Sequence, residues 1–197
     1  VITEVPQEFV DEMKTAQAIV DLIKEDFLFW ASGPTYPYTF INERLHIDAI
    51  GQQHIGNLDA IAVMNLLKGK GKTYGLIPRS VSADGNDVLI HMNVPCPPLV
   101  IDTISVLPVE HYGFSVITEN NEDIISSVKI EGDTIRLTCS KSPLNCKVRY
   151  AVNGEKMKSG RLHGSRGNLR DSQGQFVSFS IEGKKYPLNN WCYQFEI

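Results

Sequence analysis

Hydrophobic positions in the first third of the chain recur with the period of an α-helix. One such stripe is formed by Phe9, Met13, Ala16, Val20 and Ile23. Its intervals of three and four residues predict an amphipathic helix, and Pro6 suits the first turn. A short apolar run over 26–31 predicts a buried strand. A second helix is predicted over 49–68, with Asp48 as its N-cap and the glycines within 69–71 at its end.

The hydrophobic pattern changes near residue 72 to that of β-strands. Strands are predicted over 88–94, 99–102, 114–117, 126–130, 134–139, 147–152 and 176–181. Turn signals between them are Asp-Gly-Asn at 84–86, Glu-Gly-Asp at 131–133 and Asn-Gly at 153–154. Strands at this spacing without intervening helices are typical of an antiparallel sandwich. The segment 160–175, rich in Gly, Arg, Ser and Asn, is predicted to form a long loop.

The order of these elements predicts an α+β fold built from two units. Residues 1–72 would form a helix–strand–loop–helix unit, and residues 73–197 an antiparallel β-sandwich. A length of 197 residues, 42% of them apolar and 21% charged, is ordinary for a globular protein of one or two domains.

Charge and hydropathy narrow the classes of partner. A net charge of −4 argues against a nucleic-acid backbone as the main partner. No apolar run approaches the roughly 20 residues that a membrane helix requires, and the N-terminus shows no signal-peptide pattern. We therefore expect neither nucleic acid nor a membrane as a partner. Because the sequence starts at Val1, we expect a processed product or an engineered piece.

The cysteines do not have the spacing of a zinc site, and no metal is expected. They are Cys96, Cys139, Cys146 and Cys192. Cys139 and Cys146 could face each other across a turn and form a disulfide. The alternative is that these are buried free thiols, which behave as small hydrophobic groups.

An acid and a histidine form the strongest candidate for chemistry. Glu43 precedes His46 by three residues, just ahead of the predicted second helix. At this spacing a carboxylate can reach the far nitrogen of the imidazole and hold the ring as a general base. His54 is predicted to be a helix-surface or packing residue. The remaining histidines, His91, His111 and His163, are not predicted to be catalytic.

The surrounding sequence resembles one enzyme family. His46-Ile-Asp-Ala-Ile-Gly-Gln-Gln-His-Ile-Gly56 is similar to the His-Leu-Thr-x-x-Gly-x-x-x-(Ile/Leu)-Gly stretch of SGNH/GDSL-type esterases. Three further segments look like the sandwich appended to sialate and carbohydrate O-acetylesterases: Lys-Val-Arg-Tyr-Ala at 147–151, Gly-Asn-Leu-Arg-Asp-Ser at 167–172 and Leu-Asn-Asn-Trp-Cys at 188–192. The chain thus resembles the C-terminal part of such an enzyme, as found in bacterial esterases and in bacteriophage tail spikes and fibres.

The resemblance implies that residues 1–72 close an SGNH α/β catalytic domain. It implies His46 as the general base and Glu43, where the family has Asp, as the acid that orients the imidazole. The serine nucleophile would come from the upstream part of the same polypeptide, and no metal or organic cofactor is implied. Gly132-Asp133-Thr134 resembles the nucleophile block with Thr in place of Ser. It falls at a predicted hairpin turn, so we interpret it as a hairpin loop.

The implied function is the removal of O-acetyl groups from an acetylated surface polysaccharide, with the isolated chain inactive. The alternative is a non-enzymatic carbohydrate-binding or oligomerising module of a phage tail fibre, in which the acid–histidine pair is a vestige. A homo-oligomer is expected as well, a trimer in the case of a fibre. The expected location is a virion tail fibre or the extracellular space, with a bacterial secreted or periplasmic enzyme as the alternative.

Overall fold

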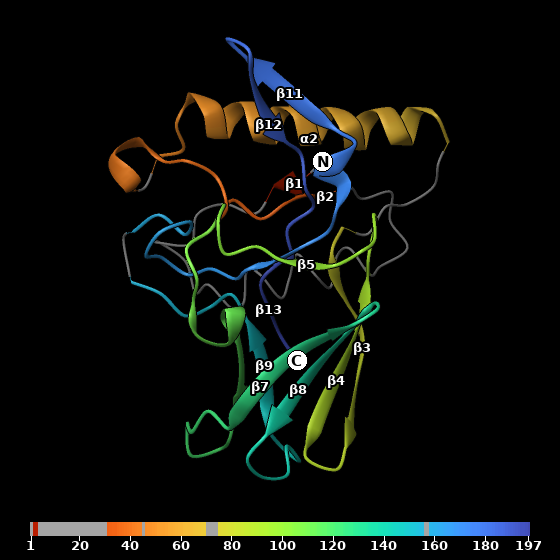
Figure 1. Cartoon of the computed structure of the whole chain (residues 1–197), viewed down its shortest axis with the longest axis vertical. Coiled ribbons are helices and arrows are strands. Elements are labelled where there is room, and N and C mark those ends of the chain that lie inside the picture. Colours follow the sequence, from red (N-terminus) through yellow and green to blue (C-terminus); the bar gives the residue numbers. More distant parts are fainter. Residues whose placement is uncertain (1, 4–30, 45, 70–74, 156–157) are drawn as a thin grey trace.

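Antiparallel β-structure makes up most of the described chain (Figure 1). The computed structural model describes residues 2–3, 31–44, 46–69, 75–155 and 158–197. Helix α2 (Ala49–Leu67) lies at one end of the molecule and the largest sheet lies at the other (Figure 1). The helix predicted to begin near Pro6 and nearly all of the strand predicted over 26–31 lie outside the described residues.

Helix α2 forms where the sequence predicts it. The side chain of Asp48 caps the helix by accepting a hydrogen bond from the N–H of Gly51 at 2.8 Å. The chain leaves the helix at Gly69, whose φ of 64° is a conformation that glycine adopts without strain. Among the described helices, none is long and apolar enough to cross a membrane.

A four-stranded antiparallel sheet forms the far end of the molecule. Its strands, in spatial order, are β3 (Ile77–Asp84), β4 (Asp87–Asn93), β8 (Thr134–Cys139) and β7 (Ile125–Glu131). Two-residue turns join β3 to β4 and β7 to β8, and their glycines, Gly85 and Gly132, have φ angles of 59° and 66°. Positive φ there gives turns that match the twist of the strands. The predicted hairpin at Gly132-Asp133-Thr134 is confirmed.

The other strands form a three-stranded sheet and several short pairs. The sheet contains β13 (Phe195–Glu196), β9 (Lys147–Tyr150) and β6 (Phe114–Ile117) in that order. The antiparallel pairs are β5 (Val100–Ile101) with β10 (Leu169–Arg170) and β11 (Ser178–Ile181) with β12 (Lys184–Pro187). The parallel pair is β1 (Ile2–Thr3) with β2 (Ala31–Gly33). Short 3-10 turns are η1 (Ile41–Glu43), η2 (Glu110–Gly113) and η3 (Gln173–Gln175).

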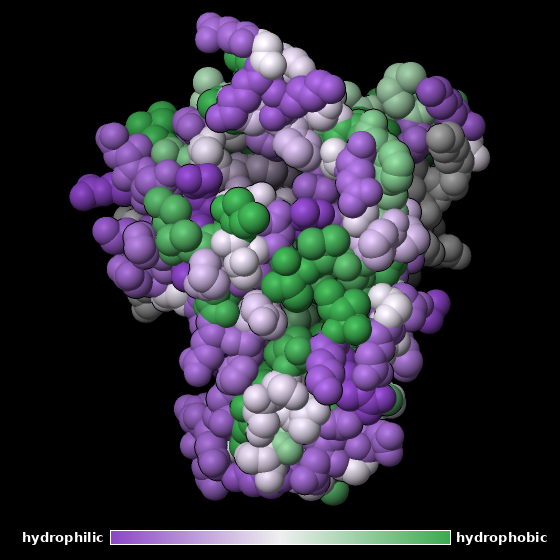
Figure 2. Space-filling model, viewed as in Figure 1, coloured by the Kyte–Doolittle hydropathy of each residue, from purple (hydrophilic) through white to green (hydrophobic). Residues whose placement is uncertain are grey.

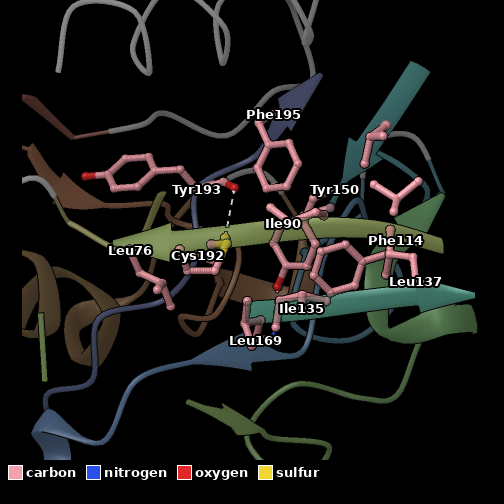
Figure 3. Close-up of a cluster of buried hydrophobic side chains, with 14 of the residues drawn as sticks. Leu76, Ile90, Phe114, Ile135, Leu137, Tyr150, Leu169, Cys192, Tyr193 and Phe195 are labelled. Atoms are coloured by element: carbon pink, nitrogen blue, oxygen red, sulfur yellow. Dashed lines mark hydrogen bonds between the residues drawn. The ribbon is translucent and has the colours of Figure 1, made fainter. Parts of the chain in front are cut away.

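One hydrophobic core is shared by the two larger sheets (Figure 3). Ile90 and Leu137 contribute to it from the four-stranded sheet, and both are completely buried. From the three-stranded sheet, the ring of Tyr150 lies 4.6 Å from that of Phe114 and 5.5 Å from that of Phe195. Alternate side chains of β4 and β8 are buried, as the two-residue period of a half-buried strand requires. Burial of these side chains therefore holds the sheets together.

A second, smaller cluster joins α2 to the C-terminal hairpin β11–β12. Tyr38 and Leu58 pack there with Leu188, and Val177 and Phe179 lie against them. Figure 1 shows the hairpin beside α2 at the same end of the molecule. Side chains on both sides of residue 72 thus share one cluster, and the division into units 1–72 and 73–197 stays a prediction.

Within the described residues, the second predicted helix and the mainly antiparallel β-structure after it are confirmed. The prediction of one long loop over 160–175 was partly wrong, because β10 and η3 fall within it. A polar segment can form a strand when its backbone pairs with that of a neighbouring strand, and β10 pairs with β5 in this way. The disulfide considered between Cys139 and Cys146 does not form, and of these two thiols Cys139 is buried and Cys146 is half-buried.

Candidate functional site

The residues predicted as an acid–base pair lie on a tight turn that leads into α2. The turn closes through an isolated antiparallel bridge between Phe40 and Ile47. At its end, the N–H of Asp48 donates to the carbonyl of Thr39 at 3.0 Å, and the Asp48 carboxylate accepts a hydrogen bond from the Thr39 hydroxyl. The helix cap and the turn therefore share Asp48, so the N-terminus of α2 fixes where the turn lies.

Two consecutive residues on this turn have an unfavourable backbone. Asn42 and Glu43 have φ angles of 54° and 52°, in the left-handed region that glycine prefers. Such conformations cost roughly 1–3 kcal/mol each and persist only where the surroundings hold them. The N–H of Ser159 holds this backbone by donating to the carbonyl of Glu43 at 3.1 Å. Backbone strain of this kind clusters at functional sites, although His111 and Tyr112 form a second such pair elsewhere in the described chain.

The carboxylate of Glu43 is bound by a loop from the β part of the chain. The buried hydroxyl of Ser159 donates to Oε2 of Glu43 at 2.5 Å. Nε of Arg161 lies 3.4 Å from Oε1 of the same carboxylate. A hydroxyl donor and a guanidinium therefore fix the position of the Glu43 carboxylate from the β part of the chain.

His46 lies on the same turn with its side chain exposed to solvent. Its carbonyl accepts a hydrogen bond from the N–H of Ile41 at 2.6 Å. Within the described residues its imidazole has no hydrogen bond or ion pair, and none joins it to Glu43. The structure therefore brings both predicted site residues onto one turn, while the contact in which Glu43 orients His46 stays a prediction.

An open pocket of about 570 Å³ lies next to this turn. Segments far apart in the sequence line it, among them Tyr38, His54, Ser105, Arg161, Tyr186 and Trp191. Arg161 belongs to both places, because it pairs with Glu43 and also lines the pocket. In Figure 2 the surface is hollowed below the β11–β12 hairpin, whose side chains are mostly hydrophilic. Volume and lining are in the range of small-molecule binding sites.

His54 forms part of the aromatic wall of the pocket. Its ring stacks on Tyr38 at 5.1 Å and meets Phe179 edge-on at 4.8 Å. Nδ1 lies 3.1 Å from the carbonyl of Ile50, one helical turn earlier. Burial lowers the pKa of His54, and the hydrogen bond to Ile50 offsets this only in part. His54, predicted to be a helix-surface or packing residue, packs against the rings of Tyr38 and Phe179.

Sequence reasoning missed Ser159 and Arg161, which hold Glu43. Arg161 lies in the segment 160–175, rich in Gly, Arg, Ser and Asn, and Ser159 lies directly before it. Loops commonly carry binding residues, so the loop-like composition of this segment was the signal in the sequence that could have indicated them. No group of three or more His, Cys, Asp or Glu residues that could hold a metal occurs in the described ranges.

Comparison with known proteins gives a weak structural likeness and no sequence match. No family model matches this chain, and no curated protein sequence matches it. The fold is similar to the crystal structure of a carbohydrate acetylesterase from Xanthomonas citri, with 14% sequence identity and a TM-score of 0.49. The match covers 78% of this chain and 29% of that chain. A likeness at this level carries no argument about what this chain does.

Proposed function

We propose that this chain is the C-terminal part of an SGNH-type serine esterase that removes O-acetyl groups from a polysaccharide. The observation that carries the proposal is the turn before α2. On it an exposed imidazole, His46, lies three residues after a strained acid that loop residues hold from the other side. The family's acid–histidine motif occupies the same place in the sequence.

In the proposed reaction His46 acts on a serine supplied by the upstream part of the polypeptide. The imidazole takes the serine proton while the hydroxyl oxygen attacks the acetyl carbonyl. The protonated ring then returns the proton to the departing sugar oxygen, which leaves an acetyl-serine. Water attacks this ester with His46 again as base, so acetate and the free enzyme are formed. An exposed imidazole without a partner in the described chain suits a base that serves a group from outside it.

Glu43 is the proposed acid partner, and Ser159 and Arg161 are its positioning residues. The Glu43 carboxylate is held at 2.5 Å by Ser159 and at 3.4 Å by Arg161, on the turn that carries His46. To orient His46 directly, one carboxylate oxygen of Glu43 would leave Ser159 or Arg161 and accept a hydrogen bond from Nδ1 of the His46 imidazole. A charged carboxylate near the ring stabilises the imidazolium that forms during the reaction.

The pocket supports a second candidate function. A non-enzymatic carbohydrate-binding module needs a concave site with an aromatic wall and a few polar groups, and the pocket beside Tyr38, His54 and Trp191 has both. In this case the turn at Glu43 and His46 has no chemical role. The two candidates differ in whether acetate is released.

The test is hydrolysis of p-nitrophenyl acetate and release of acetate from an acetylated polysaccharide by the longest product of the reading frame. We expect activity that falls by about 10²–10⁴-fold in His46→Ala, the usual contribution of a positioned base. His91→Ala is the matched control, because His91 lies on β4 with its Nδ1 bonded to Thr134 at 2.9 Å. Equal activity in the His46 variant and the wild type would refute the esterase proposal. An inactive long product would favour the binding module.

A further inference from the structure

The pocket beside the turn has a charge balance that points to the class of its ligand. Three of the residues that line it are cationic, namely Arg161, Lys184 and Lys185. None of its described lining residues is acidic. The cations come from two separate segments, the loop after β9 and strand β12 at its start. A concave site lined by one sign of charge concentrates ligands of the opposite sign.

Much of this positive charge is available to a ligand. Arg161 is paired with Glu43 through Nε at 3.4 Å, while 29% of its side chain remains exposed and the residue lines the pocket. Nζ of Lys184 lies 5.2 Å from the centre of the Tyr186 ring, a cation–π contact that leaves its protons accessible. Lys185 is exposed and has no ion pair with a described residue.

The remaining lining provides what a sugar ring needs. Tyr186 and Trp191 supply apolar surface, and the polar residues Thr39, Ser105 and Asn189 also line the pocket. The hydroxyls of Thr39 and Ser105 donate to Asp48 and Asp102, so these two residues are held in place by bonds within the protein. Such a mixture of aromatic wall and few polar groups fixes the orientation of a small polar ligand. An arginine fork suits a carboxylate, because the two oxygens match its planar donors.

We propose that this pocket binds a carboxylate-bearing sugar unit, with the carboxylate beside Arg161 and the β12 lysines. The choice of a sugar rests on the proposed function, and the choice of an anion rests on the pocket alone. The polysaccharide on which the protein acts is accordingly an acidic one. Because Arg161 contacts both Glu43 and the pocket, a bound carboxylate would lie next to the turn that carries His46.

The test measures binding by titration calorimetry to the His46→Ala protein, so that it does not depend on hydrolysis. The probes are the methyl glycosides of glucuronate, galacturonate and N-acetylneuraminate, each beside its carboxyl-reduced counterpart. We expect at least one acidic sugar to bind about tenfold or more tightly than its reduced form, the loss of one charge-assisted contact. The preference should weaken as salt is raised, because the lysines are exposed.

The double variant Lys184→Ala/Lys185→Ala tests whether the β12 lysines bind the carboxylate. It should weaken binding of the acidic sugar about tenfold. The matched control is Lys141→Ala with Lys147→Ala, which changes the net charge equally at lysines that pair with Glu122 and Glu196 outside the pocket. Thermal denaturation of both variants checks that they fold. Equal affinity for acidic and reduced sugars, an equal effect of both variants, or no binding of any acidic sugar would each overturn the inference. Binding without esterase activity would retain it and refute only the enzymatic proposal.

Discussion

Asp102 should be among the most important polar residues for stability, because it is buried and fully bonded. Its Oδ1 accepts hydrogen bonds from the N–H groups of Ile104 and Ser105 at 3.0 and 2.8 Å. Its Oδ2 accepts from the Ser105 hydroxyl at 2.9 Å and from Nε of Arg170 at 2.6 Å. These bonds tie the loop that carries Ser105 into the pocket to strand β10. We predict that Asp102→Ala destabilises the whole molecule and loosens this side of the pocket.

The magnitude follows from the buried ion pair. Burial by itself raises the pKa of Asp102, but the bonds from Ser105, Arg170 and Ile104 outweigh it and hold the pKa below its ordinary value, so the group is charged. Removing one partner of a buried pair costs about 3–5 kcal/mol. Arg170 keeps contacts with the carbonyl of Asp171 at 2.8 Å and the side-chain oxygen of Asn189 at 3.3 Å. We therefore expect Asp102→Ala to lower the free energy of unfolding by about 3 kcal/mol, the lower end of that range.

The assay is thermal and urea denaturation followed by circular dichroism. For a chain of this size about 3 kcal/mol corresponds to a fall in Tm of roughly 6–12 °C. The control is Asp133→Ala, because Asp133 also faces an arginine, Arg79, but at 3.8 Å with both side chains exposed. Its Tm should not change measurably. A fall in Tm for Asp102→Ala as small as that of the control would refute the reasoning.

Two further predictions concern Tyr150 in the main core and His54 in the wall of the pocket. Tyr150→Phe removes the oxygen that accepts the N–H of Leu169 at 2.8 Å, and leaving this buried donor unpaired should cost about 1–3 kcal/mol in the free energy of unfolding. Urea denaturation checks this, and an unchanged midpoint would contradict it. Because burial lowers the pKa of His54 in the folded state, the unfolded chain binds its proton first as the pH falls below about 6.5. The stabilising contribution of neutral His54 is therefore fully present above that pH and is lost as the pH falls below it. The Tm of the wild type should fall more steeply with decreasing pH than the Tm of His54→Gln. Equal falls in Tm would show that His54 does not contribute.

Local patterns in the sequence predicted the elements whose cause is local. Apolar spacing predicted α2, and Asp48 was recognised as its cap because the capping bond spans only to Gly51. Alternation predicted β6 and β8 with the bounds that the structure has. The glycine turns that join the strands of the four-stranded sheet were also found, since a two-residue hairpin depends on the conformation of its own residues. Strand β3 was missed because it is an edge strand that is exposed over most of its length.

The sequence by itself determined these elements, the antiparallel class of the β part and the three-residue spacing between Glu43 and His46. Only the tertiary structure decided what holds Glu43 and what surrounds the pocket. Ser159 is 116 residues from the carboxylate that it binds, and the pocket collects cations and aromatic rings from separate segments. Contacts of this kind depend on how sheets and helix pack, because they result from the burial of apolar side chains elsewhere in the chain. Local periodicity and residue spacing in the sequence therefore do not predict these long-range contacts.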